Sequence, residues 1–444
     1  AVGMNALASN TTANDNVAVG NNVLDTNTTG TANVGVGYNV LSGNTSASNN
    51  TGLGHKALEA NTTGAQNTAV GTFASNANTT GAGNTVVGYA AMFLNTTGGQ
   101  NVAVGRNALN ANTTANNDTA VGYNSLAANT TGTNNVAVGA FALDANTTGQ
   151  QNTAVGFNSL TSNTTANFNV ALGDNCLSLN TTGTSNVAVG TLTLAANTTG
   201  SNNIGVGVNT LDSNTTASNN TGVGHQALAA NTTGQNNTAL GHDALLFNTT
   251  ASSNTSVGQG SLRQCTTGNS NAACGKGALN SSTTASNCTA MGHDVLVGVT
   301  TGDDNTGCGR AAGAGVTTGS NNTFLGVDAG RTNSPSGNIT TSSNNVVLGN
   351  NSISNLFCAD TSISSSDSRD KTDVTSFNIG LAWVNALRPV TYRWDRRTWY
   401  GTDAEPYGTP DGSKKRARLH VGFLAQEALE VEKANGYGTS NDDS

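Results

Sequence analysis

Apolar and polar residues recur along the first three quarters of the chain with a fixed period of 17 residues. The triplet Asn-Thr-Thr, once Asn-Thr-Ser, begins at Asn10 and returns in the same frame until Asn248. With the first residue of the triplet as position 1, the consensus is N-T-T-[GA]-x-x-N-[VT]-[AG]-V-G-x-x-[AS]-L-x-[AS]. The frame continues, with a different first residue, at Cys265, Ser282, Val299 and Val316, which gives 19 starts. A fixed period of this kind is typical of a solenoid or a repeat array.

Each position of the repeat has its own character. Position 10 is always apolar, position 15 is almost always Leu, position 11 is always Gly, and position 7 is Asn except at Asp118 and Cys288. The Val-Ala-Val segment alternates as in a strand, and Ala-x-Leu has the length to return as a second one. We therefore predict an all-β fold, a parallel β-solenoid with one coil per repeat. Positions 10 and 15 are expected to face the interior.

Stacking of such coils brings identical side chains about 4.8 Å apart. Asn at position 7 would then form a ladder of amides along one edge, and 19 coils would make a shaft on the order of 90 Å long. One Val and one Leu per coil bury too little apolar surface to balance the ordering of a whole repeat. We therefore predict an oligomer, and the resemblance described next implies a homotrimer. The small residues at position 9, on the other face of the strand, would allow a neighbouring chain to approach.

The repeat resembles the head repeats of trimeric autotransporter adhesins, whose core also reads Val-Ala-Ile/Val-Gly followed by a small residue. The resemblance covers residues 1 to about 330. It implies a left-handed parallel β-roll in each chain, with three rolls packed side by side.

The frame is lost after about residue 332, so residues 1–332 are assigned to the shaft. All prolines and tryptophans lie beyond it, with 11 of the 17 Lys and Arg residues. We interpret residues 333–365 as a transition and cap, because an array needs its last strand edge covered. Residues 344–349 repeat the motif once more, and Ile353, Leu356 and Phe357 are candidate capping residues.

Three sequence blocks mark a second domain from residue 366 to residue 444. They are Ser-Asp-Ser-Arg-Asp-Lys at 366–371, Ala-Leu-Arg-Pro-Val-Thr-Tyr-Arg-Trp at 386–394, and Gly-Phe-Leu-Ala-Gln-Glu at 422–427. In this order they resemble the intramolecular chaperone of endosialidase tailspikes, phage tail fibres and some membrane-bound transcription factors. The resemblance implies a small α+β domain that trimerises, directs folding of the β-stalk before it, and is released by self-cleavage. It also implies a final coiled-coil helix, which we expect to be truncated here.

The first block carries the candidate chemistry of self-cleavage at the Ser366–Asp367 bond. Ser366 would be the nucleophile and Lys371 the base, which requires desolvation or nearby cations such as Arg369 to lower the pKa of the lysine. Asp367 would position or strain the scissile bond. The alternative is that these residues form only a polar turn. No external substrate and no cofactor are expected.

Several other residues invite a functional interpretation. His55, His225, His242 and His293 all occupy position 12, where we expect solvent-facing turn residues and no metal site, since a metal needs more converging ligands. Cys274 and Cys308 occupy position 10, two coils or about 9.6 Å apart, which is too far for a disulfide. Buried free thiols, and assembly in a reducing cytoplasm, are therefore expected. The Asn-Thr-Thr triplets are better explained by turn chemistry than by glycosylation.

Composition narrows the function further. A net charge of −8 argues against a nucleic-acid partner, and no apolar run reaches the roughly 18 residues of a membrane span. Ala1 lies in the middle of a repeat, so we expect a preceding segment that attaches the fibre to a particle. The favoured function is a virion fibre, of the tail-fibre or spike type, that projects a surface toward a host receptor or glycan. The rival is a bacterial surface adhesin; an ice-binding solenoid is a minor alternative, because adjacent threonines should point to opposite sides.

Overall fold

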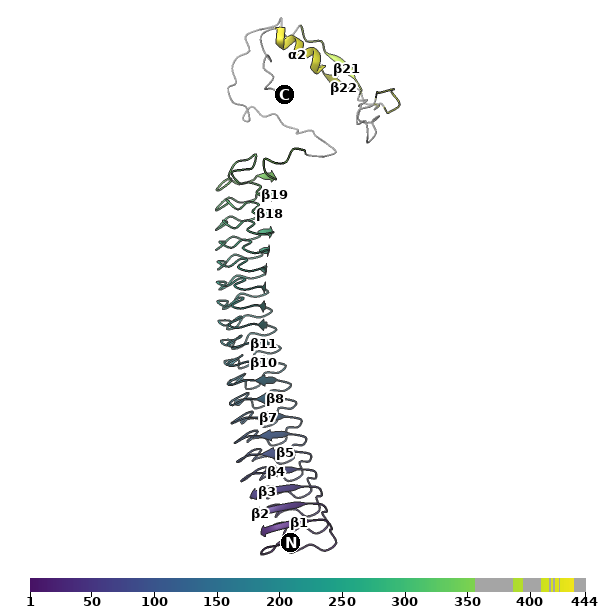
Figure 1. Ribbon diagram of the computed structural model, residues 1–444, viewed down its shortest axis with the longest axis vertical. Helices are drawn as coiled ribbons and strands as arrows, with labels where there is room; N and C mark the ends of the chain where they lie inside the picture. The colour runs from purple at the N-terminus through teal and green to yellow at the C-terminus, as the bar shows by residue number, and fades with distance from the viewer. Residues whose placement is uncertain (356–385, 394–408, 415–416, 418–419, 423, 435–444) are drawn as a thin grey trace. The chain divides into compact units, whose positions relative to one another are not determined.

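The computed structural model describes residues 1–355, 386–393, 409–414, 417, 420–422 and 424–434. The chain divides into two compact units, Ala1–Leu356 and Phe357–Ser444. The first unit confirms the parallel β-solenoid, with one coil per repeat and coils stacked into a column (Figure 1). Within the described residues, no helix has the length and apolar character to cross a membrane.

One short strand per coil, at positions 8 to 10, pairs in parallel with the same positions of the next coil. Val136, for example, pairs with Thr153, its equivalent in the following repeat. The strands of this sheet are β1 Val17–Asn21, β2 Val34–Tyr38, β3 Thr51–His55, β4 Thr68–Val70, β5 Thr85–Val87, β6 Val102–Val104, β7 Thr119–Val121, β8 Val136–Val138, β9 Thr153–Val155, β10 Val170–Leu172, β11 Val187–Val189, β12 Ile204–Val206, β13 Thr221–Val223, β14 Thr238–Leu240, β15 Thr255–Val257, β16 Ala272–Cys274, β17 Thr289–Met291, β18 Thr306–Cys308, β19 Thr323–Leu325 and β20 Val346–Leu348.

The expected second strand, the Ala-x-Leu segment, is absent from the described coils, and that expectation was wrong. Positions 13 and 15 adopt the left-handed conformation instead, as at Phe141 (φ 57°) and Leu143 (φ 53°). This turn lets two successive residues, Ala142 and Leu143, both point inward with no exposed surface. A strand could not do so, because its side chains alternate between faces. The prediction that position 15 lies inside is confirmed.

The expected orientation of positions 9 and 10 was also wrong, because the strand faces the other way. The position-9 residues Ala137 and Ala154 are fully buried, whereas Val155 at position 10 is 37% exposed. Both residue types are apolar, so alternation alone does not tell which face is inside. The interior is already filled by positions 14 and 15, which in most coils leaves room for only a small side chain at position 9; Val86 and Phe324 are larger buried exceptions.

Size matching between neighbouring coils explains the glycines at position 9. Val40 at position 14 leans into the next coil, and a Cβ at Gly52 would lie 2.5 Å from its Cγ1. In five pairs of neighbouring coils, here called matched seams, a β-branched residue at position 14 faces a glycine at position 9 of the next coil in this way. They are Val23–Gly35, Val40–Gly52, Thr193–Gly205, Thr210–Gly222 and Val295–Gly307. At Phe324 the sizes are reversed, because the large residue lies at position 9 and the glycines lie at position 15. Gly313 and Gly330 make room for the ring of Phe324.

Position 11 is glycine for two independent reasons. Gly139 has φ of +135°, a conformation that residues with a Cβ rarely adopt. A Cβ there would also lie 2.4 Å from the carbonyl oxygen of Gly156 in the next coil. Any substitution at this position would therefore both strain the backbone and push two coils apart.

Two buried columns of asparagine run along the interior, one at position 7 and one at position 1. In the first, which confirms the expected ladder, the backbone N–H of Asn50 donates to Asn33 Oδ1 at 2.9 Å. In the second, Asn44 Nδ2 donates to Asn27 Oδ1 at 2.8 Å. These amides satisfy buried backbone groups of the turns, so the polar interior costs little.

Asp118 interrupts the position-7 column with a buried carboxyl group. Its oxygens accept from the backbone N–H of Asn135 (2.8 Å) and from Asn129 Nδ2 (3.0 Å), yet desolvation dominates and raises its pKa to about 7. Between about pH 4 and pH 7 the folded chain therefore binds a proton that the unfolded chain releases, and stability falls as the pH rises through this window.

We expect Asp118→Asn to remove this pH dependence and to stabilise the column above pH 7 by on the order of 3 kcal/mol. Thermal unfolding of both proteins between pH 4 and pH 8 measures the effect. The exposed control Asp15→Asn should keep the profile of the parent. Parallel profiles for the parent and Asp118→Asn would contradict the assignment.

The column gains one more coil after a shift of frame. Strand β20 pairs with β19 at an offset of 23 residues, as in Thr323 opposite Val346, so six extra residues are inserted. Asn345 continues the amide column by donating its backbone N–H to Asn322 Oδ1 at 3.0 Å. Ser334, from the inserted segment, donates its hydroxyl to the carbonyl of Gly349 at 3.0 Å. Of the candidate capping residues, Ile353 is 55% exposed, and Leu356 and Phe357 lie outside the described residues.

Candidate functional site

The candidate self-cleavage residues Ser366, Asp367 and Lys371 lie outside the described residues. The other two blocks of the C-terminal unit are partly described. Strand β21, Val390–Tyr392, belongs to the second block and pairs antiparallel with β22, Val390 facing Gly422. Strand β22, His420–Gly422, leads into the third block and helix α2, Ala425–Ala434. The fold thus brings together two of the three blocks that the sequence singled out.

An ion pair also joins these two blocks. Arg388 Nε donates to Glu427 Oε2 at 3.0 Å, and a second Arg388 nitrogen binds Oε1. The hydrogen bond from Arg388 lowers the pKa of Glu427. Because both side chains are well exposed, the pair orients the blocks more than it stabilises them.

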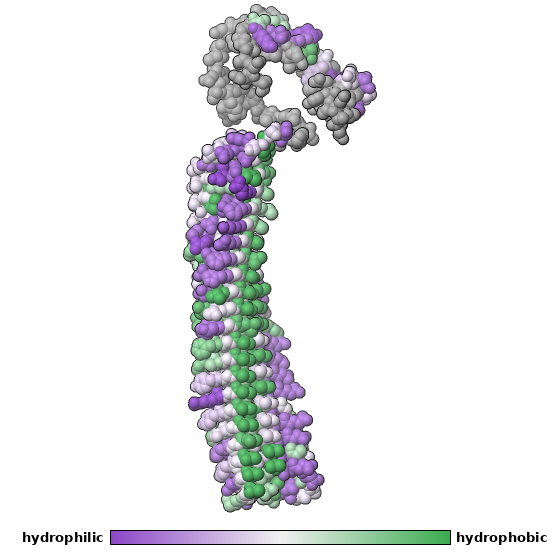
Figure 2. All heavy atoms as spheres, in the orientation of Figure 1, coloured by the Kyte–Doolittle hydropathy of each residue, from purple (hydrophilic) through white to green (hydrophobic). Residues whose placement is uncertain are grey.

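An apolar stripe lies on the outer face of the shaft's sheet. Position 10 is apolar in every coil, and these side chains point away from the interior. Figure 2 shows a continuous hydrophobic band along the column. Its more exposed members are Val19, Val36, Leu53, Val87, Val155, Leu240, Met291, Leu325 and Leu348. A stripe of this length on one face is the kind of surface that a protein partner covers.

A row of aromatic side chains follows position 12, and position 13 supplies the ring where position 12 is small. Neighbouring rings lie 5.2 to 6.2 Å apart, and one arginine stacks between two tyrosines at 5.7 and 5.9 Å. The row runs through Tyr38, His55, Phe73, Tyr89, Arg106, Tyr123, Phe141 and Phe157. Its members come from eight successive coils, so sequence analysis of position 12 alone did not reveal it.

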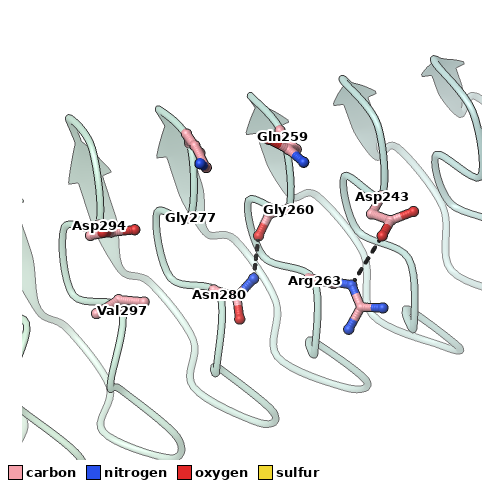
Figure 3. A pocket seen from close by; sticks show the side chains of 9 residues that line it. Asp243, Gln259, Gly260, Arg263, Gly277, Asn280, Asp294 and Val297 are labelled. Atoms are coloured by element: carbon pink, nitrogen blue, oxygen red, sulfur yellow. Dashed lines mark hydrogen bonds and ion pairs between the residues drawn. The ribbon is translucent and has the colours of Figure 1, made fainter.

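From His225 to Arg310 the residues at position 12 are polar, and a shallow groove crosses the coils in this stretch (Figure 3). Arg263 Nε donates to Asp243 Oδ2 at 3.2 Å, and Asn280 Nδ2 donates to the carbonyl of Gly260 at 2.7 Å. Lys276 and Asp294 also line the groove. Its lining carries both signs of charge, so the groove suits the binding of a polar ligand.

Two of the four histidines at position 12 lie on adjacent coils and share a nearby carboxylate. The rings of His225 and His242 stack at 5.1 Å, and Asp243 lies beside them. Sequence analysis placed both histidines at position 12 but missed Asp243, although it directly follows His242.

The cysteines differ from expectation in where they lie. Cys274 and Cys308, at position 10, are exposed, because that face is outside. Cys265 and Cys288 replace asparagines of the two amide columns, and burial raises the pKa of each thiol to about 11. Their sulfurs donate to the carbonyls of Gly268 (3.3 Å) and Gly302 (3.4 Å), as an asparagine amide would. Protonated, buried thiols of this kind are unreactive.

Comparison with known proteins bears on the C-terminal unit. Residues 366–437 match the family described as the chaperone of endosialidase. The match includes all three blocks and the candidate residues of the first one. No curated protein shows a sequence match to the chain. The molecule is therefore a parallel β-solenoid followed by a region similar to the chaperone of endosialidase.

Proposed function

We propose that the chain is the shaft and folding domain of a homotrimeric fibre on a virus or phage particle, of the tail-fibre or tailspike type. The observation that carries this proposal is the order of the two parts: a long β-solenoid directly precedes the region similar to the endosialidase chaperone. A bacterial surface adhesin would account for the repeats but is not favoured by the C-terminal match.

The trimer interface is assigned to the apolar stripe at position 10. Sequence analysis placed it at position 9, but those residues are buried inside each chain. A partner for the stripe must present apolar groups at the same spacing of about 4.8 Å over many coils. Another copy of this chain does so, and the chaperone similarity independently points to a trimer.

The host-facing surface is assigned to the aromatic row at positions 12 and 13. Its exposed rings, such as Tyr89 (51%) and Phe157 (50%), offer flat faces on which the apolar face of a sugar can stack. The hydroxyls at position 2 are less suited to a ligand such as ice, because they already bind within the column. Thr147 Oγ1, for example, donates to the carbonyl of Thr164 at 3.0 Å.

Self-processing at the Ser366–Asp367 bond completes the proposal. Ser366 acts as the nucleophile and Lys371 as its base, with Asp367 next to the cleaved bond. The support is that all three residues fall within the matched segment 366–437. Cleavage releases the C-terminal region once the shaft has assembled, and no external substrate is involved.

Charging the apolar stripe should dissociate the fibre without unfolding the coils. We expect the double variant Val138→Asp, Val155→Asp to lower the mass measured by light scattering from that of three chains to that of one chain. Val155 is 37% exposed in the single chain, so an aspartate there finds water and leaves the coil intact. The circular dichroism of the variant should therefore still show the β-structure.

A matched control carries the same charges on a different face. Thr148→Asp, Thr165→Asp alters two exposed residues at position 3 of adjacent coils, and should leave the trimer mass unchanged. A trimer that tolerates charge at position 10 as well as at position 3 would refute the interface.

A further inference from the structure

A cluster of three metal-ligating side chains sits on the shaft, apart from the stripe and the aromatic row. His225 and His242 occupy position 12 of adjacent coils, and Asp243 occupies position 13 of the second coil. One ligand atom from each of them lies within 4.8 Å of the others. The stacking of coils thus brings together side chains that are a full repeat apart in the chain.

The carboxylate of Asp243 is arranged with one oxygen held and the other available. Arg263 Nε donates to Oδ2 at 3.2 Å, and Figure 3 shows the other oxygen pointing away from Arg263. That oxygen, Oδ1, is buried and accepts no hydrogen bond within the described residues, and the nitrogen beside it is His242 Nδ1 at 3.3 Å. A buried carboxylate oxygen without a donor is unfavourable, and it requires a cation or a water to satisfy it.

The distance between the two closest ligand atoms suits a small divalent ion. His242 Nδ1 lies 3.3 Å from Asp243 Oδ1. This is about the edge of a tetrahedron whose metal–ligand bonds are roughly 2.05 Å long. His225 supplies a third ligand once its exposed ring rotates out of the stack with His242, and a fourth place is left for water.

We infer that His225, His242 and Asp243 form a binding site for a divalent transition-metal ion such as Zn²⁺ or Ni²⁺. Imidazole nitrogens with one carboxylate oxygen are ligands typical of these ions, whereas Ca²⁺ and Mg²⁺ prefer oxygen alone. The ion would bridge two coils and satisfy Asp243 Oδ1. This site does not depend on the proposed fibre function, since all its ligands come from one chain.

The shaft contains a natural comparison for this site. His293 and Asp294 repeat the His-Asp pair at positions 12 and 13, with Nδ1 and Oδ2 3.1 Å apart. The preceding coil, however, carries Lys276 at position 12 where the proposed site has a histidine. A cation in place of a ligand should abolish metal binding there.

Isothermal titration of the untagged full chain with Ni²⁺ alone at pH 7.5 tests the assignment. We expect one ion per chain, with affinity weakened about tenfold or more by His225→Ala and by Asp243→Asn. The matched control His293→Ala should bind as the parent does. Lys276→His, which completes the second His-His-Asp set, should raise the stoichiometry to two.

Thermal unfolding provides a second readout that does not depend on heat of binding. Ni²⁺ should raise the unfolding temperature of the parent and of His293→Ala but not of His225→Ala. The assignment is overturned if the parent takes up no ion, if His225→Ala and Asp243→Asn bind as the parent does, or if His293→Ala loses affinity equally.

Discussion

Leu143→Asp is expected to destabilise the coils around it by more than about 5 kcal/mol. Leu143 has no exposed surface, and truncating such a residue to alanine alone costs about 2–5 kcal/mol. The aspartate adds an unpaired charge in the apolar interior. Because each coil contacts only its neighbours, the defect should divide the column into two segments that unfold separately. Thermal unfolding followed by circular dichroism would show two transitions or one at a much lower temperature.

The adjacent residue supplies the control for this change. Asp144 is half-buried at the surface and accepts a hydrogen bond from the hydroxyl of Thr161. Asp144→Asn preserves an acceptor, so its unfolding should stay close to that of the parent. If Leu143→Asp unfolds no more easily than Asp144→Asn, position 15 cannot be the core of the coil.

Removing residues 366–444 before expression is expected to give aggregated or misaligned shafts. A slip of one chain by a single repeat keeps nearly all contacts within and between columns, so slipped trimers differ little in energy from the aligned one. An aperiodic element must therefore align three chains before the coils assemble. Electron microscopy and light scattering of the truncated chain should show heterogeneous lengths and masses, whereas the full chain gives one species.

The timing of removal separates an assembly role from a stabilising one. In the parent, cleavage at Ser366 after assembly should leave a trimeric, heat-resistant shaft of residues 1–366 on a gel. Ser366→Ala and Lys371→Ala should each assemble correctly but remain full-length. Homogeneous trimers from the truncated chain would disprove the chaperone role, and equal processing of both variants would exclude the Ser-Lys pair.

Periodicity predicted the solenoid, the buried leucine and the amide column, because a strict repeat allows one coil conformation to serve all its copies. It did not predict the turn at positions 13 to 15. Left-handed conformations at residues such as Phe141 and Leu143 are locally unfavourable and result from packing of the whole coil. The orientation of the strand was missed for a different reason, since valine and alanine can each face the interior.

A usable signal for the strand orientation was nevertheless present in the sequence. Glycine at position 9 occurs only after a coil with valine or threonine at position 14, as in Val40 and Gly52. Such covariation between coils indicates contact between the two positions. The proposed metal ligands show the complementary limit: the 17-residue spacing places His225 beside His242, but the direction of the Asp243 side chain depends on the left-handed turn, which the spacing does not specify.

The five matched seams also govern how the shaft can change length. Recombination between near-identical repeats would delete or duplicate whole coils. Loss of residues 27–43 would place Val23 against Gly52 and preserve the match, whereas loss of residues 44–60 would place Val40 against Ala69, where no space is left for its methyl group. In the middle of the column, from Ala91 to Ala171, positions 9 and 14 carry only small residues, so a coil can be deleted or duplicated there without a misfit. Variation in shaft length should therefore accumulate in that middle stretch. Elsewhere, the loss of a coil beside a matched seam can leave its β-branched residue without a facing glycine, so the coils on either side of the middle should be retained.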